Sequence, residues 1–154
     1  MLKKLGLIVN PIAGMGGRVG LKGADGVVEK ARALGALPQS PLRALRALKI
    51  LEDIKDEFVI FTAVGDMGEN IALKYGFETK VIGKCKDGST TSEDTIAIAK
   101  KLLSQNIDLL LFAGGDGTAR NIYEAIGGAM PVVGIPDKIK GYNKNLLKIQ
   151  EVLS

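Results

Sequence analysis

The residues Gly114–Thr118, Gly-Gly-Asp-Gly-Thr, follow the apolar run Leu109–Phe112 and precede a segment with helical spacing. Because glycine lacks a Cβ atom, such a turn lets the backbone approach an anion, and the first N–H groups of the next helix offer donors. A phosphate would repel Asp116 unless this carboxylate binds a nucleotide-borne metal ion or accepts a proton from an attacking hydroxyl. Alternatively, Asp116 or Thr118 only caps the helix. The spacing alone does not decide.

A second glycine-rich segment, VNPIAGMGGR, follows the first apolar run of the chain. The side chain of Asn10 can fix the turn, the glycines from Gly14 onward leave room for a ligand, and Arg18 can pair with a phosphate. A plain glycine loop with a surface arginine is the alternative. Two common phosphate motifs are missing: GxxxxGK[ST] does not occur, and GxGxxG fails at Val19 and at Arg120.

The composition excludes several other kinds of chemistry. The chain of 154 residues has no His and only one Cys, Cys85, which rules out Ser-His-Asp and Cys-His mechanisms and most zinc sites. A formal charge of +4 without a basic helix face, together with the lack of Trp, argues against a nucleic-acid partner. One Cys cannot form an intrachain disulfide, and no apolar run suits a signal peptide or a membrane span. We therefore expect a cytoplasmic protein without membrane contact.

Short apolar runs alternate with segments of helical periodicity. Strands are predicted at Leu5–Val9, Glu57–Val64, Thr79–Ile82, Ile107–Phe112 and Pro131–Ile135. Helices are predicted at Val27–Leu34, Leu42–Ile54, Met67–Tyr75, Ser92–Ser104, Ala119–Ile126 and Asn145–Leu153. This alternation predicts an α/β fold, a three-layer parallel sheet of about five strands with helices on both faces.

Details of the predicted helices follow from spacing as well. Asp66 and Glu69 are spaced for a capping box at the helix that begins at Met67. The inner face of the Ser92–Ser104 helix is expected to carry Ile96, Ala99 and Leu103, and that of the Ala119–Ile126 helix Ile122, Ala125 and Ile126.

Four predicted strands end in turn residues: Asn10-Pro11, Gly65-Asp66, Gly114-Gly115-Asp116 and Ile135-Pro136-Asp137. In open parallel sheets, ligands bind beyond the carboxyl ends of the strands. The turns therefore gather at the edge where a ligand is expected.

Taken together, these motifs resemble a known group of kinases. Asn-Pro-x-x-Gly at residues 10–14, followed later by Gly-Gly-Asp-Gly-Thr, resembles the superfamily of NAD kinases, diacylglycerol kinases and sphingosine kinases. GGRVGLKGADG, TTSEDT and LLLFAGGDGTARNI are similar to the ATP-NAD kinase-like family that includes the acetoin catabolism protein X group. The matches span residues 5 to 135 in the expected order. The resemblance implies that residues 1–154 form a single α/β nucleotide-binding domain like the NAD kinase N-terminal domain.

The resemblance also implies roles for individual residues. Asp116 would be the catalytic carboxylate that activates the acceptor hydroxyl, with ATP and Mg²⁺ as cofactors. Asn10 and Gly14 would belong to the nucleotide pocket. A hydroxyl at Thr91 could reach a phosphate, as could its neighbours Thr90 and Thr95, although capping of the next helix is an equal alternative. The remaining implied residues would cradle phosphates: Gly114, Gly115, Gly117 and Thr118.

The chain departs from this family after Val-Val-Gly-Ile-Pro. The family continues with a small residue, a glycine and a second, mainly β domain, whereas this chain reads Asp137-Lys138-Ile139-Lys140 and ends at Ser154. The second domain is therefore expected to be absent. One hypothesis is ATP-dependent transfer of a phosphoryl group to a hydroxyl of a nucleotide or small molecule. The others are a non-catalytic module that binds a nucleotide or polyphosphate, and a domain fragment whose uncovered apolar face makes a homo-oligomer.

Overall fold

The computed structural model describes residues 2–11, 40–83 and 92–135. The strands in these ranges are β1 Lys3–Val9, β2 Phe58–Ala63, β3 Thr79–Gly83, β4 Leu109–Ala113 and β5 Val132–Gly134. The α-helices are α3 Ser40–Leu51, α4 Glu69–Lys74, α5 Ser92–Ser104 and α6 Asp116–Ile126. Two 3-10 helices precede and follow β2 in the chain, η1 Glu52–Glu57 and η2 Gly65–Met67.

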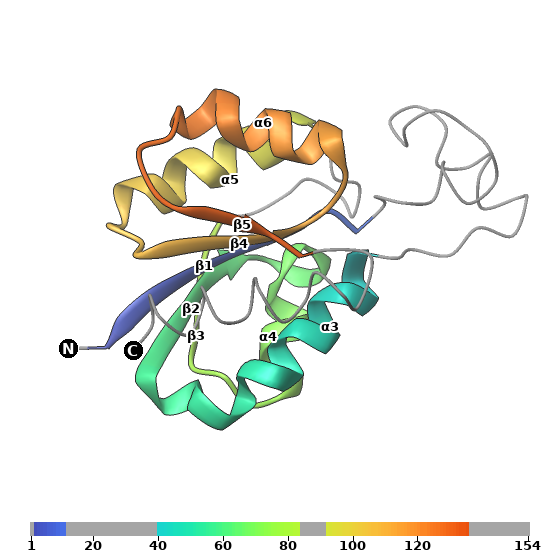
Figure 1. Ribbon diagram of the computed structural model, residues 1–154, viewed down its shortest axis with the longest axis vertical. Coiled ribbons are helices and arrows are strands. Elements are labelled where there is room, and N and C mark those ends of the chain that lie inside the picture. The colour runs from blue at the N-terminus through green and yellow to red at the C-terminus, as the bar shows by residue number, and fades with distance from the viewer. Residues whose placement is uncertain (1, 12–39, 84–91, 136–154) are drawn as a thin grey trace, which may run out of the picture.

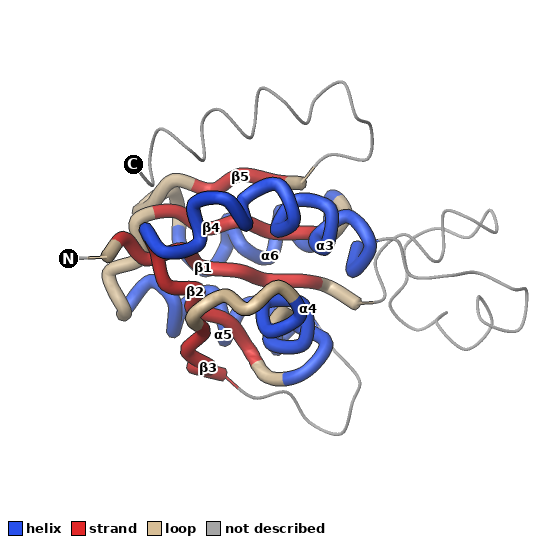
Figure 2. The backbone as a smooth tube through the Cα atoms, turned by 90° about the horizontal axis from the view of Figure 1, so that it is seen from below, coloured by secondary structure: helices blue, strands red, loops and turns tan. Residues whose placement is uncertain are grey.

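The strands form one parallel sheet in the order β3-β2-β1-β4-β5, so the first strand of the chain lies at its centre. Leu7 of β1 is aligned with Thr62 of β2 on one side and with Leu111 of β4 on the other. Helices α3 and α4 cover one face of the sheet, and α5 and α6 cover the other (Figure 1, Figure 2). The predicted three-layer α/β fold with helices on both faces is confirmed.

Each face of the sheet has its own apolar core, because successive side chains of a strand point to opposite faces. Leu5 and Leu7 of β1 pack with Leu48 of α3 in one core, which also takes in α4. Ile8 of β1 packs in the other core, which includes Ile98 of α5. Strands covered on both faces need apolar residues at nearly every position, and this explains the continuous apolar runs in β1, β2 and β4.

Each predicted strand corresponds to an observed strand, with ends that differ by a few residues. The helix predicted at Leu42–Ile54 begins earlier, at Ser40, and ends at Leu51, where the chain continues as η1. The predicted helix Ser92–Ser104 has the observed bounds of α5. The predicted helices Val27–Leu34 and Asn145–Leu153 lie outside the described residues.

The predicted capping box of Asp66 and Glu69 is wrong. α4 begins after Gly68 and no side chain caps it, while Glu69 Oε1 accepts a hydrogen bond of 2.9 Å from the N–H of Gly65. Asp66 is exposed, and its Oδ1 accepts a hydrogen bond from Asn70 Nδ2 at 2.9 Å. The physical reason is the backbone: Gly65 and Gly68 have φ angles of 62° and 150°, which divide the predicted helix into a 3-10 turn and a short α-helix.

The buried face of α5 differs from the predicted one by a rotation about the helix axis. Its buried residues are Thr95, Ile98, Ala99 and Leu102, whereas Ile96 and Leu103 are only partly buried. The prediction followed the large apolar residues and overlooked that Thr95 lies within the buried stripe. On α6 the expectation holds, because Ile122 and Ile126 are buried and Ala125 packs against the same core.

Candidate functional site

The site expected from the sequence lies where the chain changes direction across the sheet. From β1 the chain leads through α3 to β2 on one side, and from β4 it leads through α6 to β5 on the other. In open α/β sheets a ligand binds beyond the carboxyl ends of two such neighbouring strands. Asn10 follows β1 and Gly114 follows β4, and the N–H of Asn10 donates to the carbonyl of Ala113 at 2.9 Å. Asn10 and the glycine turn therefore flank this switch point.

The Gly114–Thr118 turn leads directly into α6. Gly115 is the N-cap residue with extended backbone angles, φ −99° and ψ −164°, and no side chain makes a capping hydrogen bond. Asp116 is the first residue of the helix and is exposed. The alternative that Asp116 or Thr118 caps the helix is therefore wrong. The Thr118 hydroxyl instead accepts a hydrogen bond from Asn10 Nδ2 at 3.0 Å, which joins α6 to the end of β1.

The glycines of the turn differ in what the protein requires of them. A Cβ atom at Gly114 would lie 2.5 Å from Thr118 Oγ1 and 2.6 Å from Thr118 Cβ, so only glycine fits there. At Gly115 and Gly117 an added Cβ would meet nothing within 4 Å. Packing within the described chain thus explains Gly114, and it leaves open space beside Gly115 and Gly117.

Backbone donors accompany this open space. Within the described residues, the first backbone hydrogen bond that closes a turn of α6 runs from the N–H of Ala119 to the carbonyl of Gly115, at 3.1 Å. The N–H groups of Asp116, Gly117 and Thr118 precede it and are the unpaired donors found at every helix start. Together with the positive end of the helix dipole, they suit an anion.

Sequence reasoning missed Arg43. This residue lies in the first turn of α3 and is partly buried. Its Nη2 donates to Ser40 Oγ at 3.0 Å and to the carbonyl of Gly114 at 3.5 Å, so the arginine reaches the glycine turn from the opposite face of the sheet. Burial lowers the pKa of the Arg43 guanidinium below its ordinary value, although an arginine stays charged at neutral pH. Nothing in the spacing of SPLRALRAL separates Arg43 from Arg46, and only the fold distinguishes them.

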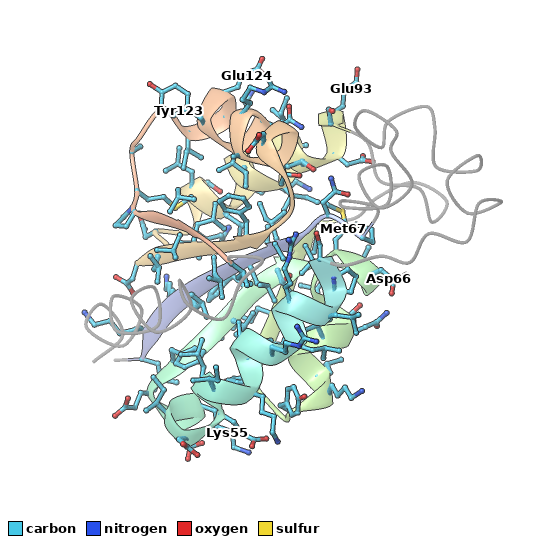
Figure 3. All side chains as sticks on the ribbon, turned by 45° about the vertical axis from the view of Figure 1, so that its right-hand side comes forward. Lys55, Asp66, Met67, Glu93, Tyr123 and Glu124 are labelled. Atoms are coloured by element: carbon cyan, nitrogen blue, oxygen red, sulfur yellow. The ribbon has the colours of Figure 1, made fainter. Side chains whose placement is uncertain are left out.

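The other predicted site residues do not join this group. Gly14 and Thr91 lie outside the described residues, as do Arg18 and Thr90. Asp66 lies at the end of β2 and points away from the body of the protein (Figure 3). Thr95 is buried, with 1% of its surface exposed.

Within the described ranges, no cluster of three or more His, Cys, Asp or Glu residues could hold a metal ion by itself. No helix in the same ranges has the length and apolar character needed to cross a membrane.

Comparison with protein families supplies the identity that the geometry leaves open. The family model described as ATP-NAD kinase N-terminal domain matches residues 5–152. The chain belongs to this family. No curated protein matches its sequence. The resemblance to the ATP-NAD kinase-like family is thereby confirmed, while the finer likeness to the acetoin catabolism protein X group stays a prediction. Membership associates the chain with ATP-dependent kinase chemistry, a nucleotide ligand and a divalent metal ion.

Proposed function

We propose that this chain is a phosphotransferase domain that moves a phosphoryl group from ATP to a hydroxyl group of a nucleotide or related small molecule. One observation supports this most: Asp116 and the unpaired N–H groups of α6 lie at the switch point between β1 and β4, in a member of the ATP-NAD kinase N-terminal domain family. Phosphoryl transfer depends mainly on positioning and charge neutralisation, so the lack of His is no obstacle.

The phosphates of the nucleotide are assigned to the start of α6. The open space beside Gly115 and Gly117 allows an anion to approach the backbone there. The N–H groups of Asp116, Gly117 and Thr118 then provide the donors. Asn10 supports this arrangement, because its hydrogen bond to Thr118 ties the first turn of α6 to β1.

Asp116 is assigned the acceptor side of the reaction. Mg²⁺ is commonly bound by one or two carboxylates together with substrate phosphates. The exposed carboxylate of Asp116 lies beside the N–H groups assigned to the phosphates and could supply such a ligand. When bound, the metal ion neutralises charge on the phosphoryl group. A carboxylate has two oxygens, so one remains to accept the proton of the acceptor hydroxyl.

A second candidate is a nucleotide-binding module without turnover. The observation that favours it is the exposure of Asp116, since water at the reacting groups weakens the electrostatic stabilisation of phosphoryl transfer. In this case nucleotides would bind at the same turn, but no product would form.

Binding is tested first, by measuring the melting temperature with ATP, NAD, NADP and polyphosphate, each with and without Mg²⁺. Both candidates expect at least one nucleotide to raise the melting temperature, because a ligand that binds only the folded state stabilises it. If no ligand raises the melting temperature and no product forms, both candidate functions are wrong.

Turnover is tested by ATP-dependent product formation with Asp116→Asn and, as the matched control, Asp66→Asn. Both are exposed carboxylates that follow a strand, but only Asp116 lies at the switch point. We expect Asp116→Asn to lower kcat by about 100-fold or more and Asp66→Asn to leave it unchanged. Nucleotide binding without product in the unmodified chain would support the module instead.

A further inference from the structure

We propose that Arg43 is a positioning residue of the nucleotide site, whose guanidinium holds the Gly114–Gly115 peptide so that the Gly115 N–H faces the bound phosphate. The inference rests on the proposed function and deepens it, because it adds a residue from α3 that lies outside both glycine motifs. It also explains why a cation is kept between a helix and a strand end on the face of the sheet opposite α6.

Arg43 makes hydrogen bonds to Ser40 and to the Gly114 carbonyl. Ser40, whose surface is fully buried, accepts a hydrogen bond from Arg43 Nη2 at 3.0 Å and so fixes the guanidinium at the start of α3. The same nitrogen has a second hydrogen, which is directed to the carbonyl of Gly114 at 3.5 Å. This contact is long for a hydrogen bond. Contacts in active sites are often long in the free protein and tighten when the ligand binds.

The peptide bond between Gly114 and Gly115 links Arg43 to the ligand side of the turn. The peptide bonds of the described residues contain no cis form, and in a trans peptide the C=O and the following N–H point in opposite directions. A donor on the Gly114 carbonyl therefore turns the N–H of Gly115 away from α3. Gly115 itself has open space beside it, because an added Cβ there meets nothing within 4 Å. On its other side the turn rests on the side chain of Thr118, which Asn10 holds.

The partial burial of the Arg43 charge supports a functional role. Burial lowers the pKa of its guanidinium, which means that the charged form is partly desolvated at this position. Groups with a perturbed pKa are concentrated at functional sites. The planar guanidinium can donate to Ser40 and Gly114 from a single nitrogen while its charge stays at the carboxyl edge of the sheet.

The contact is tested in the free protein by the ¹H–¹⁵N signals of Gly114, Gly115 and Gly117. The variants are Arg43→Met, Arg43→Lys and, as control, Arg46→Met, which changes an exposed arginine on the same helix. We expect Arg43→Met to shift both the Gly114 signal and the Gly115 signal. Arg43→Lys should restore part of both effects, and Arg46→Met should cause neither. Unchanged glycine signals in Arg43→Met would overturn the proposal.

The consequence for the ligand is tested by the Kd of ATP with Mg²⁺ at several salt concentrations. We expect Arg43→Met to raise Kd by about tenfold, as for loss of a hydrogen bond to a charged group, and Arg43→Lys to recover most of the affinity. Because Arg43→Lys keeps the positive charge, the dependence of Kd on salt in this variant should stay as in the unmodified chain. Ser40→Ala, which removes one hydrogen bond from the guanidinium but keeps its charge, should raise Kd in the same direction.

Each contrary result has a distinct meaning. A lower melting temperature with unchanged Kd would make Arg43 merely structural and overturn the proposal. Full affinity in Arg43→Lys without any recovery of the glycine signals would mean that the charge alone acts on the phosphate, and would overturn the positioning role too. If the unmodified chain binds no nucleotide, the proposed function fails, whereas the glycine signals of the free protein still decide whether Arg43 holds the turn.

Discussion

Glycine is required for different reasons at positions 114 and 117. At Gly114 the reason is internal, since any side chain would collide with Thr118. At Gly117 there is no collision, and the residue lies within α6, where glycine is the least favourable residue apart from proline. A glycine that packing does not need and helix propensity disfavours is expected where a ligand approaches the backbone.

We expect Gly117→Ala to stabilise the protein and to weaken nucleotide binding. The gain should be about 0.5–1 kcal/mol at most, because alanine loses less conformational freedom in a helix, or a rise of about 2–4 °C in melting temperature at the upper end. The added methyl group would occupy space assigned to the phosphates. Thermal unfolding and ATP titration of the same variant measure both effects.

Gly114→Ala is the matched comparison for this prediction. It should lower stability by about 1–3 kcal/mol, the usual cost of forcing atoms into a packed site. If Gly117→Ala binds ATP as tightly as the unmodified chain, the phosphates do not lie against Gly117, and the assignment of the ligand to the start of α6 is wrong.

At the scale of elements, a side-chain hydrogen bond joins the end of β2 to β1, and the turn between β2 and α4 packs against it. Thr62 donates from Oγ1 to the carbonyl of Leu7 at 2.7 Å, and both the residue and the contact are buried. Gly68 passes directly over this hydroxyl with a φ of 150°, and a Cβ at Gly68 would overlap Thr62 Oγ1. The turn between β2 and α4 therefore depends on glycine for both its conformation and its space.

This packing predicts a coupling between Gly68 and Thr62. Gly68→Ala should destabilise the protein by about 2–4 kcal/mol, from the positive φ and the overlap together. Thr62→Ala removes the overlapping hydroxyl, so the double variant should be less destabilised than the sum of the two single variants. Urea unfolding of the four proteins in a double-mutant cycle measures the difference, and strict additivity would show that the overlap is relieved in another way.

The elements were predictable from sequence where one signal dominated. The apolar runs of β1 and β4, and the glycine turn that follows β4, predict the carboxyl ends of these strands to within one residue, and parallel strands bring those ends to one edge. The capping box failed because the spacing of Asp66 and Glu69 is blind to the φ angles of the glycines beside them. Arg43 could not be identified from the sequence, because its contact is with Gly114, 71 residues further along the chain. Only the assembled sheet brings α3 and Gly114 together.

At the scale of the whole molecule, two cores share one sheet. Leu48 of α3 and Leu102 of α5 are both fully buried, one on each face. Because the strands between them contribute side chains to both cores, neither layer can lose its packing without affecting the other. We therefore expect the described chain to unfold as one cooperative unit.

Leu48→Ala and Leu102→Ala test this expectation from opposite faces. Each should lower the free energy of unfolding by about 2–5 kcal/mol, the range for deleting a buried leucine side chain. In urea, tryptophan cannot serve as the probe because the chain has none, so circular dichroism and tyrosine fluorescence are compared. Coincident transitions are expected for both variants. A separate early transition in one of them would mean that its layer unfolds alone.

The strand order β3-β2-β1-β4-β5 affects the order in which the sheet can fold. Asn10 and Thr118, which meet beyond the ends of β1 and β4, lie 108 residues apart in the chain. Their hydrogen bond closes a long loop, and the entropy of that closure must be lost before the contact contributes any energy. The more local pairing of β1, β2 and β3 can precede it. During synthesis, a chain that has emerged from the ribosome only as far as β3 therefore presents Asn10 at the end of β1, while Thr118 is not yet available to pair with it.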